Sequence, residues 1–147
     1  MKKYIVNLNI LLFVFLIFFS AQFSLAQNSN IDETLIDKEL EECATKNYMT
    51  NGMNLCIKNS TQKWNIIINQ YLSKIKNNLP SSEIKYLDKA QKSWLNYYKK
   101  ESLFIDKLIE KEKGHIYSTT ALNKLYQLTK QRALTLKNYY LELTKNN

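Results

Sequence analysis

The chain has 147 residues and a formal net charge of +8 at pH 7, with two glycines, one proline, two cysteines and one histidine. So few turn-forming residues argue against turn-dense β-sandwiches and barrels. One histidine and two cysteines are too few ligands for a structural zinc site, and they exclude most nucleophilic schemes that depend on histidine.

The first 26 residues have the three parts of a secretory signal peptide. Lys2 and Lys3 give a basic start, residues 10–19 form an unbroken apolar run, and Ser24-Leu25-Ala26 offers small residues to signal peptidase. The alternative is an uncleaved membrane anchor, but the run is shorter than the ~20 residues that span hydrocarbon. We therefore expect cleavage following Ala26 and a periplasmic or secreted mature protein, residues 27–147, that is a single domain without a membrane span.

Apolar residues that recur at helical spacing predict four helices in the mature chain. Pro80 and Gly114 suit the breaks between the last three of them. Amphipathic helices joined by short connections pack as a bundle, so the expected fold class is all-α, a small antiparallel bundle of about four helices. These helices are expected over residues 32–45, from Met53 or Cys56 to Asn78, over 82–112 and over 118–143.

Each of the last three helices has one apolar stripe that is expected to face the core. The stripes consist of Trp64, Ile67, Ile68, Tyr71, Leu72, Ile75 and Leu79 in the first of them, Ile84, Leu87, Gln91, Trp94, Leu95, Tyr98, Ile105 and Leu108 in the next, and Leu122, Leu125, Leu128, Leu136, Tyr140 and Leu143 in the last.

The two cysteines flank a turn that is expected over residues 47–54. An even pair in an oxidising compartment is most simply a disulfide. A Cys43–Cys56 bridge would close the turn covalently. By lowering the entropy of the unfolded chain, it would add ~3 kcal/mol to the free energy of unfolding. A redox pair would usually have Cys-x-x-Cys spacing, which differs from the spacing here.

Charge is unevenly distributed along the mature chain. Removing Lys2 and Lys3 from the 21 basic residues leaves 19 against 13 acidic residues, a formal charge of +6. The first predicted helix is acidic, whereas the chain from Cys43 onward carries 18 basic and 7 acidic residues. An exported protein rarely meets nucleic acid, so we expect no such partner. A lysine-rich solvated surface and contact with anionic wall polymers or membrane surfaces both remain open.

The chain contains no motif that assembles an active site. It has no Gly-rich phosphate loop, metal-ligand motif or nucleophile elbow, so we expect a protein that is not an enzyme and holds no cofactor or metal. Trp64 and Trp94 suit core positions. Gln91 is polar within an apolar stripe and should hydrogen-bond across the bundle. Arg132, the one arginine, should act as an internal clasp, with a functional anion contact as the alternative.

Short motifs follow one another along nearly the whole mature chain. Together, in this order and at this spacing, they resemble the LprI-like lysozyme-inhibitor family. The motifs are Thr50-x-x-Met53-x-x-Cys56 followed by Trp64, Asn69 and Tyr71; Ala90-Gln91-x-x-Trp94 with Tyr97; a glycine turn at Gly114; and Leu128-Thr129-Lys130-Gln131-Arg132.

The resemblance implies an exported bacterial protein that binds and inhibits a lysozyme or another peptidoglycan hydrolase. Members of the family often carry a second cysteine pair, whose places are taken here by Ser102 and Lys124, so the resemblance implies that a whole disulfide has been lost. The alternative function is a non-catalytic envelope module that binds anionic wall or membrane polymers or another envelope protein.

Many lysozymes are cationic, so a basic inhibitor needs a local acidic face, or a loop that enters a cleft lined with carboxylates. The candidate contacts are Asp37, Glu39, Glu41 and Glu42 on the acidic helix, and Lys113 and His115 in the loop over residues 113–117.

Overall fold

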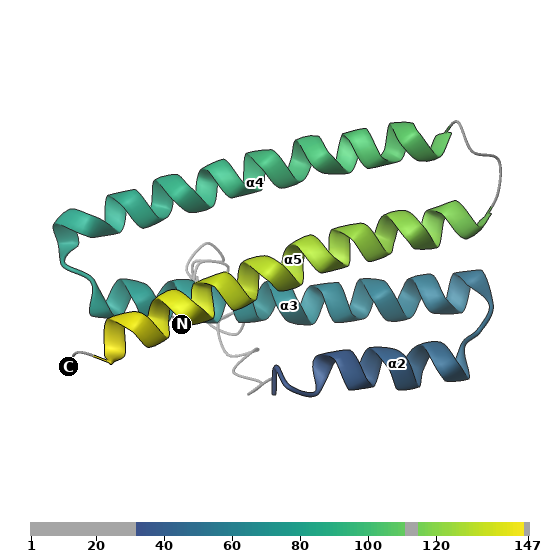
Figure 1. Cartoon of the computed structure of the whole chain (residues 1–147), viewed down its shortest axis with the longest axis horizontal. Coiled ribbons are helices and arrows are strands. Elements are labelled where there is room, and N and C mark those ends of the chain that lie inside the picture. Colours follow the sequence, from purple (N-terminus) through teal and green to yellow (C-terminus); the bar gives the residue numbers. More distant parts are fainter. Residues whose placement is uncertain (1–31, 111–114, 146–147) are drawn as a thin grey trace, which may run out of the picture. The chain divides into compact units, whose positions relative to one another are not determined.

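A computed structural model describes residues 32–110 and 115–145, without the side chains of residues 108–117. The expected signal peptide, Lys113, Gly114 and the side chain of His115 lie outside this description. The described residues form four helices and contain no strand, which confirms the all-α fold class (Figure 1). None of the described helices is long and apolar enough to cross a membrane. The helices are α2 (Ile36–Lys46), α3 (Thr50–Asn78), α4 (Ser81–Glu110) and α5 (His115–Thr144).

The first helix begins later than the sequence predicted. Asp32 Oδ1 accepts hydrogen bonds from the Thr34 backbone nitrogen at 2.9 Å and from Thr34 Oγ1 at 2.6 Å. These bonds hold residues 32–35 in a turn, because a short acidic side chain competes with helical backbone pairing. The helix therefore starts at Ile36, whose side chain is fully buried.

The connection between α2 and α3 is shorter than the predicted turn over residues 47–54. Helix α3 already starts at Thr50, so the predicted start at Met53 or Cys56 was wrong. Gly52 lies in the first turn of α3 instead of in a loop. A Cβ atom on Gly52 would lie 2.8 Å from Asn47 Cβ and 3.2 Å from the Asn47 carbonyl oxygen. Glycine is thus needed for the close approach of two helix ends, which the sequence pattern could not distinguish from a turn.

The centre of the described domain is the pair α3 and α5. Consecutive helices alternate in direction, so α3 and α5 run parallel to each other (Figure 1). Residues that touch occur in the same order along both helices: Asn54 contacts Ser118, and Trp64 contacts Tyr126. The core that they enclose with α2 consists of Ile36, Ile57, Trp64, Ile67, Ile68, Ile75, Tyr126, Ala133 and Leu136.

The other two helices pack on the outer sides of this pair, α2 against α3 and α4 against α5 (Figure 1). Ile105 is the one fully buried side chain in the described part of α4. Leu95, which was expected in the core, is 52% exposed. The reason is that α4 packs mainly against one helix, α5, and buries a narrower stripe than a helix surrounded on several sides.

The buried face of α5 also differs from its predicted stripe. Leu136 is buried as expected, but Leu122, Leu125 and Leu128 are half-buried. Helix α5 packs against α3 on one side and α4 on the other. Small and polar side chains of α5 are therefore buried in addition to its leucines. The buried residues of α5 are Ala121, Tyr126, Thr129, Ala133 and Leu136.

Candidate functional site

The predicted disulfide is present and lies directly behind the α2–α3 connection. Cys43 on α2 and Cys56 on α3 are joined, with their Cα atoms 5.8 Å apart. Asn47 closes the end of α2: its backbone nitrogen and its side-chain Nδ2 both donate to the Cys43 carbonyl oxygen, at 3.0 and 2.9 Å. A covalent bridge and two hydrogen bonds therefore fix the three connecting residues, 47–49.

This fixed connection exposes two large apolar side chains. Tyr48 is 75% exposed and Met49 is 67% exposed, the highest values among the large hydrophobic residues of the described chain. We call Lys46, Asn47, Tyr48 and Met49 the α2–α3 tip. The tip was not among the predicted contact residues, although an apolar pair beside a predicted turn is a signal for such a surface.

The four acidic residues proposed as a contact face are placed along α2, and two of them are engaged within the fold. Asp37 pairs with Lys130 of α5, and Glu39 pairs with Lys63 of α3. Glu42 lies 3.9 Å from Lys38 on the exposed surface of α2 itself, and Glu41 is exposed. The acidic residues therefore help to attach α2 to α3 and α5, a use that the charge pattern alone did not indicate.

A chain of polar contacts crosses the core at Trp64. Trp64 Nε1 donates to the Tyr126 hydroxyl at 3.2 Å, and the same hydroxyl donates to Asp37 Oδ1. Burial, together with the hydrogen bond to Asp37, raises the pKa of Tyr126 to about 12. Burial tends to raise the pKa of Asp37, but the hydrogen bonds from Lys130 and Tyr126 outweigh it and hold that pKa below its usual value.

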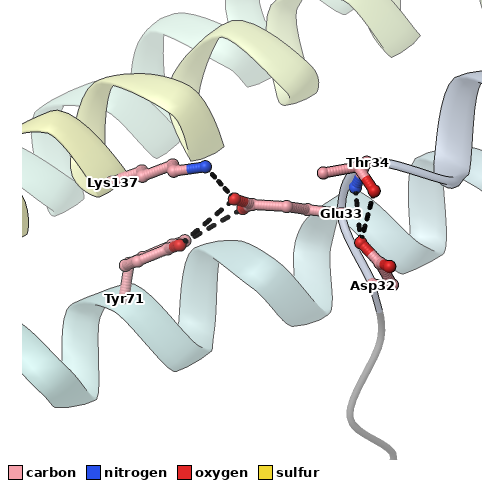
Figure 2. A network of polar contacts seen from close by, with 5 residues as sticks. All are labelled: Asp32, Glu33, Thr34, Tyr71 and Lys137. Atoms are coloured by element: carbon pink, nitrogen blue, oxygen red, sulfur yellow. Dashed lines mark hydrogen bonds and ion pairs between the residues drawn. The ribbon is translucent and has the colours of Figure 1, made fainter.

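A second polar cluster attaches the segment before α2 to the central pair. Figure 2 shows the Glu33 carboxylate between the Lys137 ammonium of α5 and the Tyr71 hydroxyl of α3, which lies 3.3 Å from Glu33 Oε2. The Glu33 side chain is 16% exposed and that of Lys137 is 33% exposed. The hydrogen bond to Glu33 raises the pKa of Lys137, and burial, with the charge of Glu33, raises the pKa of Tyr71. Tyr71 thus has a structural partner that the family motif did not reveal.

The third cluster joins α4 to α5 and contains three of the family-motif residues. Arg132 donates from Nε and Nη2 to Gln91 Oε1, at 3.0 and 2.9 Å. Its guanidinium carbon lies 5.8 Å from the centre of the Trp94 ring. The expected hydrogen bond of Gln91 across the bundle is confirmed, and the guanidinium holds an amide oxygen rather than a carboxylate.

Two further motif residues begin a helix or face the interior. Thr50 is the first residue of α3, and Met53 is partly buried against the core. Among the described residues no buried side-chain nitrogen or oxygen lacks a hydrogen-bond partner. These motif residues therefore stabilise the helical scaffold, whereas Asn69, Ala90 and Tyr97 of the same motifs are exposed.

The surface between α4 and α5 has an open groove of about 470 Å³. Glu101, Ile105, Lys124 and Leu128 are among the side chains that line it. The groove lies at the level of Ser102 and Lys124, where the resemblance places the missing second disulfide. Within residues 32–110 and 115–145 no group of three or more His, Cys, Asp or Glu side chains is arranged to hold a metal ion.

Comparisons with known proteins agree with this scaffold. The model of the family described as "Lysozyme inhibitor LprI" matches residues 41–136. The fold is similar to the crystal structure of an uncharacterised protein from Burkholderia thailandensis, with a TM-score of 0.70 and 20% sequence identity over 80% of this chain. The chain spans 58% of that protein's length. No curated protein matches the sequence significantly. The family match runs from the middle of α2 to Leu136 of α5 and includes the disulfide and the Gln91–Arg132 contact, so the chain belongs to the LprI lysozyme inhibitor family.

Proposed function

We propose that the chain is an exported helical protein that inhibits a lysozyme-type cell-wall hydrolase by protein–protein contact. The observation that carries the proposal is the family match over residues 41–136. The described architecture is compatible with inhibition by a surface, because the interior polar groups are paired with one another and the helices are tied by a disulfide. A rigid scaffold loses little conformational entropy when it binds a partner.

Export is part of this proposal. A periplasmic or secreted location, reached after cleavage following Ala26, would place the protein where cell-wall hydrolases act and where the Cys43–Cys56 bridge persists. Expression in a bacterium with a functional secretion system should release a protein whose first residue is Gln27. Amino-terminal sequencing and intact mass of the exported protein measure this, and a retained segment 1–26 would contradict it.

A lysis assay tests the inhibitory function directly. Bacterial cell walls are digested by a panel of animal and bacteriophage lysozymes, with and without the purified exported protein. We expect the fall in turbidity to slow at a near-stoichiometric ratio for at least one lysozyme. An unchanged rate with every member of the panel would contradict the proposal.

The acidic residues of α2, together with Lys113 and His115, remain candidate contacts within this proposal. The loop predicted over residues 113–117 was wrong in part, because α5 already begins at His115. Glu41 and Glu42 are the members of the acidic face that are not tied to another helix by an ion pair in the structure. Glu41→Gln with Glu42→Gln should weaken inhibition if the acidic face meets a cationic lysozyme. Lys113→Ala with His115→Ala tests these two residues in the same assay.

A second candidate function is favoured by five exposed lysines of α4. Lys85, Lys89, Lys92, Lys99 and Lys100 are exposed on it, whereas its Asp88 pairs with Lys76 of α3. This surface suits an anionic wall polymer or membrane surface. Binding of the protein to purified wall material that disappears at high salt, combined with no effect on any lysozyme, would favour this envelope module over an inhibitor.

A further inference from the structure

We propose that the α2–α3 tip is the part of this chain that enters the substrate cleft of the inhibited hydrolase. This inference rests on the proposed function, and it adds the contact surface and the site on the partner. The tip consists of Lys46, Asn47, Tyr48 and Met49.

The tip is constrained by three features of the fold. The Cys43–Cys56 bridge lies behind it, both Asn47 hydrogen bonds close the end of α2, and Gly52 packs against Asn47 without room for a side chain. Most exposed loops would have to become ordered when they bind, at a cost in conformational entropy. Here the covalent and steric constraints have already ordered the connection, so its exposed side chains are available as rigid anchors.

The α2–α3 tip exposes two side chains of the kind that protein interfaces use. Tyr48 and Met49 leave 75% and 67% of their surfaces in solvent, although both are large and largely apolar. Tyrosine and methionine are enriched in protein interfaces, where a few such residues carry most of the binding energy. The tip projects from the end of a helical hairpin, and a short convex element of this kind fits a concave site on a partner better than a flat one.

The positive charge of the tip complements the acidic cleft of a glycoside hydrolase. Glycoside hydrolases cleave their substrate between two carboxylic side chains, so the centre of the cleft is acidic and shaped for sugar rings. Lys46, two residues before Tyr48 in the chain, supplies a cation at the end of α2. The adjoining first turn of α3 contains no acidic residue and has no side-chain cap, so its backbone amides add positive potential. An aromatic ring beside a cation matches a site that binds sugar rings between carboxylates.

The test compares matched pairs of exposed substitutions in the lysis assay, with a lysozyme that the unaltered protein inhibits. We expect Tyr48→Ser with Met49→Ser to raise the concentration needed for half-inhibition about tenfold or more. Leu103→Ser with Phe104→Ser on α4, where each side chain is 57% exposed, should leave it unchanged. Circular dichroism and a thiol titration confirm that each variant keeps its helices and its disulfide.

Two further measurements test the cleft itself. Lys46→Glu should weaken inhibition several-fold, whereas Lys99→Glu on α4 should not. Saturating tri-N-acetylchitotriose, which occupies the sugar-binding cleft, should compete with the unaltered protein for lysozyme in a binding titration. Binding that is unaffected by the trisaccharide overturns insertion into the cleft.

The outcomes separate this inference from the proposed function. If the unaltered protein inhibits and the Tyr48→Ser, Met49→Ser variant inhibits equally well, the tip assignment is wrong and the inhibitory function stands. If the unaltered protein inhibits no lysozyme, the proposed function is wrong and the tip assignment, which rests on it, is overturned as well.

Discussion

Arg132 on α5 donates two hydrogen bonds to a single oxygen of Gln91 on α4, at 3.0 and 2.9 Å. Both residues belong to motifs of the LprI family, and they lie 41 positions apart in the chain. Because Ile105 is the one fully buried side chain in the described part of α4, this contact is a major attachment of α4 to α5. Burial lowers the pKa of Arg132, but an arginine remains charged at any physiological pH.

We expect Gln91→Leu to lower the free energy of unfolding by about 1–3 kcal/mol, because the half-buried guanidinium then has no acceptor. Gln91→Glu is the matched control: its carboxylate oxygen can accept the same bonds, so most of the stability should remain. Urea unfolding followed by circular dichroism measures both variants. A leucine variant as stable as the unaltered protein would show that the contact does not hold α4.

Glu33 and Lys137 should be coupled more strongly than an ordinary surface ion pair. Their side chains are 16% and 33% exposed, and Glu33 also accepts from Tyr71 (Figure 2). A double-mutant cycle with Glu33→Ala and Lys137→Ala should give a coupling energy of about 0.5–3 kcal/mol. The control cycle uses Lys38 and Glu42, whose side chains are 70% and 55% exposed, and should give about 0.5 kcal/mol or less. Equal coupling in the two cycles would refute this prediction.

The protein should lose stability in the alkaline range through Tyr126. Its pKa is about 12 in the folded chain and about 10 in an unfolded one. Between these pH values the unfolded chain releases the phenol proton while the folded chain keeps it, so the free energy of unfolding falls as the pH rises. The raised pKa values of Tyr71 and Lys137 act in the same direction.

Tyr126→Phe isolates this contribution. The variant should be less stable at neutral pH, because Trp64 Nε1 and Asp37 lose a common partner. Its disadvantage relative to the unaltered protein should shrink between about pH 9 and about pH 11, since phenylalanine has no proton to release. Urea unfolding at these two pH values measures the difference in stability. A disadvantage that stays constant would show that the pKa of Tyr126 is not raised in the folded chain.

Gly52→Ala should destabilise the protein although it lies in a helix. Alanine in place of glycine normally favours a helix by about 1 kcal/mol. Here the new Cβ atom would lie 2.8 Å from Asn47 Cβ, so the start of α3 has to move. We expect the melting temperature to fall by several degrees.

Asn51→Ala, an exposed change in the same turn, is the control and should not lower the melting temperature. Asn47→Gly removes the Asn47 Cβ but also a hydrogen bond to Cys43, so it is measured alone as well. Gly52→Ala should cost less in the Asn47→Gly background than in the unaltered protein; an equal cost would mean that the overlap is not the cause.

Features encoded in short stretches of sequence were predicted well. The 3.6-residue spacing of Trp64, Ile67, Ile68 and Ile75 marked the buried face of α3, and all four are buried. The Cys43–Cys56 bridge followed from two cysteines on either side of a turn. Helix ends were harder, because Asp32 and Gly52 act through contacts with specific neighbours, Thr34 and Asn47, and a hydrophobic pattern does not contain them.

The sequence by itself determined that this protein is helical, carries one disulfide and resembles the LprI family, since helical periodicity, cysteine spacing and motifs are read along the chain. Only the tertiary structure decided that α3 and α5 form the central parallel pair, and that Asp37 and Glu39 are bound to lysines of other helices. It also decided that Tyr48 and Met49 stand exposed on a fixed connection. These properties depend on which residues distant in sequence meet in space, and a local pattern of charge or hydrophobicity does not specify its partner.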